Sequence, residues 1–112
     1  MKHVYKPSEL QAALDSTSIP QLLDVRRVPV FEESHKLIAG AIWRDPEHVA
    51  EWSNELDSAR PVVVYCVHGH QVSQGCARQL AELGFDAAFL EGGIEAWSAA
   101  AGPMASKSGA SA

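Results

Sequence analysis

The feature that most constrains the fold of this sequence is an apolar, mostly β-branched run that ends on a cysteine: residues 61–65 (PVVVY) are followed directly by Cys66. Such a run predicts a strand that is buried on both faces, because none of its positions is suited to face water. Strands of this kind occupy the centres of parallel sheets that helices cover on both sides. Ligands of such sheets bind beyond the carboxyl ends of the strands, which is where Cys66 stands.

Strand and helix patterns alternate along the rest of the chain. Strands are predicted at residues 3–5, 21–25, 41–43 and 87–90, and helices around residues 8–14, 30–34, 46–56, 72–83 and 94–97. Ser8 and Gln11 have the spacing of a capping box at the start of the first helix. The apolar stripe of one later helix consists of Val72, Cys76, Leu80 and Leu83. This alternation predicts a compact α/β domain with a mainly parallel central sheet flanked by helices.

The length of 112 residues is that of a single domain, and the apolar share of 46% is ordinary for a globular protein. We expect the domain to span residues 1–102. From residue 101 onward the sequence has no periodicity and is rich in Gly, Ser and Ala. Residues 103–112 are therefore predicted to form a disordered tail.

Charge and hydropathy exclude several classes of protein. The net charge is −5, with nine basic residues scattered among fourteen acidic ones, which argues against a nucleic-acid partner. No apolar run approaches the roughly 18 residues of a membrane span, so we expect a soluble protein with no membrane partner. The N-terminus lacks the apolar core of a secretory signal, so the expected compartment is the cytoplasm. A reducing compartment would leave the two cysteines as thiols.

Cys66 is the residue at which chemistry is expected. It begins a loop that runs into a helix, where converging backbone N–H groups and the helix dipole favour the thiolate form. A thiolate in that position is a nucleophile, whereas the alternative interpretation is a small buried core residue. Gly69 supports the first interpretation, because a glycine lets the loop curl with left-handed torsions and turn its amides inward.

Four segments follow one another in an order that a known family shares: residues 23–26 (LDVR), 40–41 (GA), 64–66 (VYC) and 90–97 (LEGGIEAW). From about residue 3 to 102 the chain resembles a single-domain rhodanese, a member of the sulfurtransferase family. The resemblance implies that the thiolate of Cys66 attacks the outer sulfur of thiosulfate or a related donor, sulfite leaves, and the resulting persulfide passes its sulfur to an acceptor. The implied acceptors are cyanide in assays, and a small thiol or a thioredoxin-like protein in cells. Asp24 and Arg26 are implied to support the strand end.

The cradle around the cysteine is interpreted as the six-residue sulfur-binding type, residues 66–71. Phosphatase-type relatives of this fold carry a phosphate-gripping arginine at the position that Val72 occupies here. The expected substrate-binding residues of the loop are Val67, His68, Gly69, His70, Gln71 and Val72. Val67 replaces a residue that is often basic in the family, so we expect positive charge from Arg27 or Arg44, which both follow predicted strands.

Several alternatives remain open from the sequence. His68 and His70 provide too few ligands for a metal ion, so we expect no metal or other cofactor. Their imidazoles either line the rim of the cysteine loop, where they help to hold an anion, or face solvent. Cys76 and the three tryptophans are interpreted as core residues. The competing functions are a non-catalytic rhodanese-like interaction or sensing module, and redox chemistry between Cys66 and Cys76.

Overall fold

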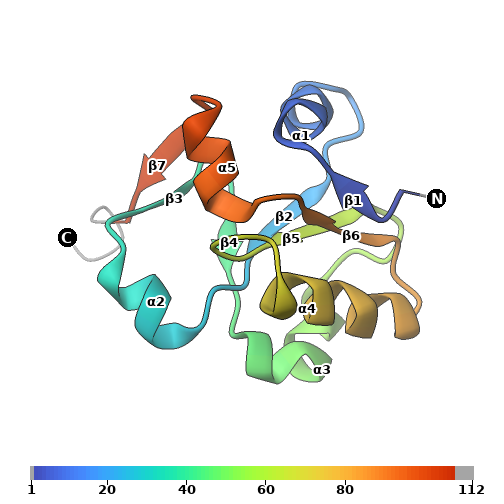
Figure 1. Ribbon diagram of the computed structural model, residues 1–112. Coiled ribbons are helices and arrows are strands. Elements are labelled where there is room, and N and C mark those ends of the chain that lie inside the picture. Colours follow the sequence, from blue (N-terminus) through green and yellow to red (C-terminus); the bar gives the residue numbers. More distant parts are fainter. Residues whose placement is uncertain (1, 108–112) are drawn as a thin grey trace.

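The computed structural model describes residues 2–107 and has a five-stranded parallel sheet at its centre, with helices on both faces (Figure 1). In spatial order the strands are β1 (Val4–Tyr5), β6 (Ala87–Leu90), β5 (Val62–Tyr65), β2 (Gln21–Asp24) and β4 (Ile42–Trp43). Every neighbouring pair in this sheet is parallel. The predicted fold class and the central place of the valine-rich strand are therefore confirmed.

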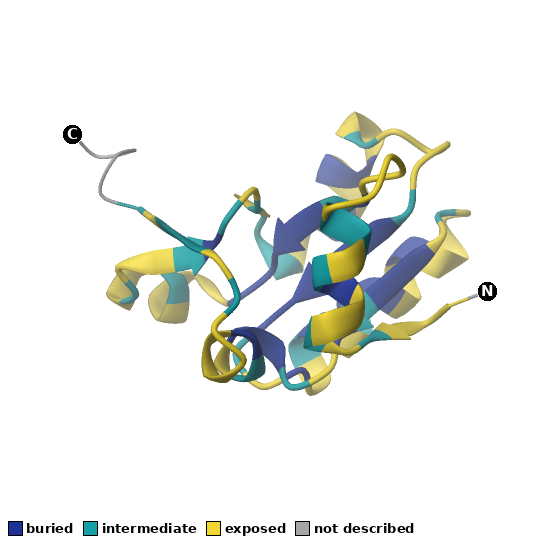
Figure 2. Ribbon diagram, turned by 90° about the horizontal axis from the view of Figure 1, so that it is seen from above, coloured by how far each residue is buried: buried dark blue, intermediate teal, exposed yellow. Residues whose placement is uncertain are grey.

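Two apolar clusters, one on each face of the sheet, form the core. Val62 and Val64 pack in the cluster that includes α3 (Val49–Trp52) and α4 (Gln71–Glu82). Val63 and Tyr65 pack in the cluster that includes α1 (Pro7–Leu14) and α5 (Gly93–Ala99). All four side chains of β5 are 0% exposed, and Figure 2 shows the buried residues gathered along the central strands. The strand is thus held from both sides, as its sequence predicts.

Several helices differ in detail from the prediction. The helix expected at residues 46–56 consists of three short pieces: the 3₁₀ turn η1 (Pro46–His48), α3 and the 3₁₀ turn η2 (Ser53–Glu55). The first helix begins at Pro7 rather than after Ser8, and its capping contact runs from the Lys6 amide to a Glu9 carboxylate oxygen at 2.9 Å. The Ser8–Gln11 capping box is therefore wrong, because Pro7 starts the helix early.

The buried side of α4 is also rotated from the predicted stripe. It consists of Ser73, Cys76, Ala77 and Leu80. Val72 is only half-buried and Leu83 is 52% exposed, so including Leu83 in the stripe was wrong. The rotation brings a serine hydroxyl to the side of the helix that faces the sheet.

A second, two-stranded sheet joins β3 (Lys36–Ile38) and β7 (Met104–Ser106) in antiparallel pairing. The predicted disorder is therefore wrong for residues 104–106, and residues 108–112 lie outside the described part of the chain. The segment is anchored by contacts from α5 and from the residue after β3: the indole N–H of Trp97 donates to the Pro103 carbonyl at 2.9 Å, and the amide of Ala39 donates to the same oxygen at 3.1 Å.

A buried polar network lies at the carboxyl end of β2. The guanidinium of Arg26 donates to both carboxylate oxygens of Asp24, at 2.7 and 3.0 Å, and to the Lys36 carbonyl at 3.0 Å. The Tyr65 hydroxyl donates to the same carboxylate at 3.0 Å and accepts from the Ile38 amide. The supporting role implied for Asp24 and Arg26 is confirmed, because this network joins both sheets.

The helix α2 (Val28–Glu33) follows this network and stands at the same edge of the sheet as Cys66. Its Phe31 ring stacks on Trp43 with centroids 5.0 Å apart, and the Lys107 ammonium contacts both the Phe31 carbonyl and the face of its ring. Trp52 and Trp97 are core residues as predicted, whereas Trp43 is only half-buried. Within residues 2–107, no helix is both long and apolar enough to cross a membrane.

Candidate active site

Cys66 lies directly after β5, at the carboxyl edge of the parallel sheet, and is 6% exposed. A short loop leads from it into α4, whose first residue is Gln71. The Cys66 Sγ atom lies 3.1 Å from the hydroxyl oxygen of Ser73, which is itself fully buried on the first turn of α4. The thiol therefore sits between the end of the central strand and the start of the longest helix.

The loop owes its shape to close backbone contact with the start of α5. Gly69 has φ +73°, and a Cβ atom there would come within 2.7 Å of the Gly92 nitrogen. Gly93 has φ +62°, and a Cβ atom there would come within 2.4 Å of the Cys66 and Val67 carbonyl oxygens. Only glycine fits either position, because both have positive φ and backbone in contact. Gly69 was predicted to let the loop curl, and in the structure this depends on its close contact with Gly92 and Gly93, which follow β6.

The same contact orients the carbonyl groups of the loop. The amide of Ile94 donates to the Cys66 carbonyl at 2.9 Å, and the amide of Glu95 donates to the Val67 carbonyl at 3.1 Å. The Gln74 side-chain amide holds the Gly69 carbonyl at 2.9 Å. With three carbonyls bound in this way, the loop N–H groups remain available to the sulfur.

The pKa of Cys66 is lowered from the ordinary thiol value. Burial opposes this by raising the pKa, but hydrogen bonds from the Ser73 hydroxyl and from the backbone amides of Ser73, His70 and Gly69 outweigh it. The thiolate is therefore more stable than that of an ordinary cysteine, without any cationic side chain among these causes. Cys76 contrasts with it: burial raises the pKa of that thiol to about 12, and it is 2% exposed in the core.

A pocket of about 220 Å³ opens above Cys66. It is lined by Arg26, Arg27, Val30, Cys66, Val67, His68, His70, Gln71 and Val72. The structure thus brings together Arg27 and most of the loop residues that the sequence singled out. Gly69 does not line the pocket, because it is buried against α5. His68 and His70 are exposed, with ring centroids 6.1 Å apart, which places them at the rim.

Arg44 is not brought to this pocket. Its guanidinium binds the Glu55 carboxylate at 3.0 Å and lines a different hollow, beside the amino-terminal part of β2. The prediction assumed that a residue following a strand projects beyond the strand's end. Here the long side chain instead turns toward η2, so of the two predicted arginines Arg27 is the one that lines the pocket beside Cys66.

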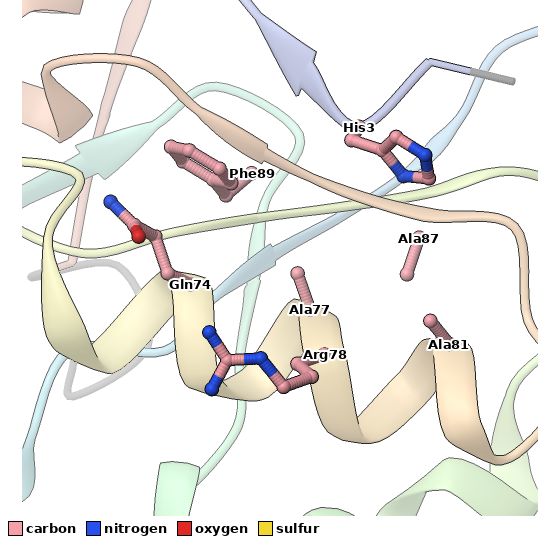
Figure 3. Close-up of a pocket in the computed structure, with 7 residues that line it drawn as sticks. All are labelled: His3, Gln74, Ala77, Arg78, Ala81, Ala87 and Phe89. Atoms are coloured by element: carbon pink, nitrogen blue, oxygen red, sulfur yellow. The ribbon is translucent and has the colours of Figure 1, made fainter.

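Sequence reasoning missed Ser73 and Gln74, which both shape the site. The available signal was the placement of a serine on the buried side of a helix, where a hydroxyl requires a partner. Gln74 also lines a separate hollow of about 260 Å³ between α4 and β6, with Ala77, Ala81, Ala87 and Phe89 (Figure 3). Within residues 2–107, no group of three or more His, Cys, Asp or Glu side chains could hold a metal ion.

Fold and site together define a parallel α/β domain with a buried cysteine whose pKa is lowered by a hydroxyl and by backbone amides. A family model described as Rhodanese-like domain matches residues 6–100. The chain therefore belongs to the rhodanese family, as its motifs predicted.

Known relatives agree with this assignment. Thiosulfate sulfurtransferase GlpE of Coxiella burnetii is 40% identical over 79 residues, which cover 70% of this chain and 71% of that protein. The protein of the same name from Pseudomonas syringae pv. syringae is 35% identical over 92 residues, covering 81% of this chain and 82% of its own. A rhodanese-related protein from Thermoplasma volcanium has the same fold, with a TM-score of 0.79 at 23% identity and coverage of 93% and 98%.

Proposed function

We propose that this protein is a sulfurtransferase that moves a sulfane sulfur from thiosulfate or a related donor to a thiophilic acceptor through a persulfide on Cys66. The observation that carries the proposal is the position of the Cys66 thiol, which lies at the end of the central strand, lines a pocket and stands 3.1 Å from the buried Ser73 hydroxyl. The lowered pKa of this thiol agrees with that geometry. Relatives named thiosulfate sulfurtransferase support the same reaction class.

The reaction has two displacement steps. The Cys66 thiolate attacks the outer sulfur of thiosulfate, the S–S bond of the donor breaks, and sulfite leaves with the bonding pair. An acceptor nucleophile then attacks the outer sulfur of the persulfide, and the Cys66 thiolate leaves. The Ser73 hydroxyl and the loop amides that lower the pKa of Cys66 also make it a good leaving group in the second step.

The proposed substrate-binding residues are the predicted ones that line the pocket around the thiol: Arg27, Val67, His68, His70, Gln71 and Val72. Arg27 supplies charge for an anionic donor, and the exposed imidazoles of His68 and His70 stand at the rim of the pocket. Proposed acceptors are cyanide in assays and a small thiol or thioredoxin-like protein in cells. Location in the cytoplasm stays a prediction.

The two competing functions have less support from the site. A non-catalytic module needs no thiolate, yet a hydroxyl and three amides stabilise one here. Redox pairing needs a second reactive thiol, whereas the pKa of Cys76 is raised to about 12 in the core.

Intact mass measurement tests the proposal directly. Incubation with thiosulfate should add the mass of one sulfur atom to the protein, and a reductant should remove it. Cys66→Ser should lose both this gain and thiocyanate formation, whereas Cys76→Ser should keep them. Full activity in Cys66→Ser would overturn the proposal, and an internal disulfide after mild peroxide would favour the redox function instead.

A further inference from the structure

The helix α2 makes little contact of its own with the core. Five of its six residues are exposed, and none of them is fully buried. Phe31 is the one residue of this helix whose side chain is half-buried, and Figure 1 shows α2 at the periphery, apart from the other helices. A helix this short is not stable by itself, so the position of α2 depends on the residues that bind Phe31.

Phe31 is bound through both its ring and its backbone. The ring stacks on Trp43 with centroids 5.0 Å apart, and the Arg26 guanidinium carbon lies 5.4 Å from the ring centroid. The Lys107 ammonium lies closer, 3.8 Å from the same centroid, and also donates to the Phe31 carbonyl. Lysine side chains stabilise helix ends by binding the last carbonyls in this way. Lys107 therefore binds the anchoring residue of α2 at two points.

The main chain at Lys107 is itself held in place by the second sheet. The Lys107 amide donates to the His35 carbonyl at 3.0 Å, directly beyond the pairing of β3 with β7. The segment that leads into β7 is fixed through the Pro103 carbonyl, which accepts from Trp97 on α5 and from Ala39. The ammonium of Lys107 thus reaches α2 from a backbone whose position does not depend on α2.

Two residues of this region form one side of the pocket at Cys66. Arg27 precedes α2 as its N-cap and Val30 lies within it, and both line the pocket. The groups that lower the pKa of Cys66, by contrast, belong to the loop and to α4. Displacement of α2 should therefore change the surroundings of the thiol without changing the groups that stabilise its thiolate.

We propose that Lys107 is a positioning residue for the pocket at Cys66. By binding Phe31 it fixes the place of α2. It thereby keeps Arg27 and Val30 at the side of the pocket, although it touches neither the sulfur nor a substrate. This inference goes beyond the proposed function, because it concerns how the pocket is built and holds for any reagent that enters it.

Alkylation of Cys66 by two reagents of different charge tests the inference. Iodoacetate is an anion, which an arginine near the thiol attracts, whereas iodoacetamide is neutral. Both reagents attack the same thiolate, so the ratio of their rates cancels any change in the ionised fraction. In Lys107→Met, which keeps an apolar side chain but loses the charge, the ratio of iodoacetate to iodoacetamide rates should fall, by no more than in Arg27→Ala. Intact mass follows both reactions, with Cys66→Ser as the blank.

Hydrogen exchange of α2 provides a second measurement. In Lys107→Met the amides of residues 28–34 should exchange about two- to fivefold faster, the factor that corresponds to one lost cation–π contact at a partly exposed site. The amides of α4 should keep their wild-type rates, because the contacts of Lys107 lie on α2. Lys107→Arg should stay near the wild type in both measurements, since a guanidinium also binds an aromatic face and a carbonyl.

Lys36→Met is the matched control. Lys36 is exposed on β3 and pairs with Ser106, the residue before Lys107. This variant removes the same charge from the same sheet but leaves the contacts of Phe31, so both measurements should keep their wild-type values. In the Arg27→Ala background, Lys107→Met should no longer change the reagent ratio, because the charge that it positions is gone.

Four results would each overturn the inference. They are an unchanged reagent ratio or unchanged exchange in Lys107→Met, an equal fall of the ratio in Lys36→Met, a fall that persists in the Arg27→Ala background, and faster exchange in α4 as well as in α2. None of these measurements uses a sulfur donor. Failure of thiosulfate to place sulfur on wild-type Cys66 would therefore end the proposed function and leave this inference standing.

Discussion

Replacing Ser73 with alanine should raise the pKa of Cys66. The hydroxyl oxygen lies 3.1 Å from the sulfur, and both groups are buried, so water cannot replace the lost hydrogen bond. A hydrogen bond to a charged group contributes about 1.5–3 kcal/mol. Its loss should lower the ionisation constant of the thiol roughly ten- to hundred-fold. The loop amides remain, so the thiolate should become less stable but still form.

The assay is the pH dependence of Cys66 alkylation by iodoacetamide. In Ser73→Ala the rate below the pKa should fall with the thiolate fraction, while the high-pH plateau should stay near the wild-type value. Ser53→Ala is the matched control, since Ser53 is also buried but bonds to the Ala50 carbonyl at 3.1 Å instead. An unchanged pH profile in Ser73→Ala would refute the assignment of the hydroxyl to the thiolate. A change of equal size in Ser53→Ala would refute it too, because it would indicate a general loss of packing.

Three further predictions follow from the charges of the site and the core. Arg27→Ala should raise the thiosulfate KM more than it lowers kcat, and this difference should shrink as the salt concentration increases. Arg44→Ala should change neither constant. Equal changes in KM in the two variants would contradict the placement of the two arginines. Aryl phosphates should turn over negligibly, since no arginine stands at the sixth position after Cys66, and rapid Cys66-dependent hydrolysis would count against this. Burial raises the pKa of Cys76 from 9.0 to about 12, so between these pH values the thiol is ionised in the unfolded chain but not in the folded one, and the free energy of unfolding should fall as the pH rises. Chemical denaturation across this pH range should show a smaller fall in Cys76→Ala than in the wild type. An equal fall in both would exclude Cys76 as the cause.

The central strand and the reactive cysteine could be predicted because local sequence determines both. Residues 61–65 contain no polar position, so they have no stable place except between two covered faces. Cys66 follows at the edge where parallel strands open onto a ligand site. The supporting role of Asp24 and Arg26 was expected only from the resemblance to the rhodanese family, and the structure shows the two charges bound to each other.

The second sheet could not be predicted because its stability comes from distant contacts. Residues 104–106 (MAS) have neither β-branched side chains nor alternation, and they pair with residues far earlier in the chain. Trp97 and Ala39 bind the Pro103 carbonyl and so determine where the segment lies. The Lys107 contact with Phe31 then holds this segment against α2, one of whose residues lines the pocket.

The positive potential at Cys66 comes from backbone amides and a hydroxyl, which is why the amino-acid composition did not indicate that an anion is stabilised here. A net charge of −5 disfavours anion binding when side chains alone are counted. Here the groups that lower the pKa of Cys66 are one hydroxyl and three backbone amides, and amides occur at every residue except proline. The sequence must therefore specify the direction in which these amides point. It does so through Gly69 and Gly93, which allow the loop after Cys66 and the start of α5 to come into backbone contact. A side chain at either position would separate the two backbones and release the carbonyls of Cys66 and Val67, so the glycines maintain the electrostatics of the site without touching the sulfur.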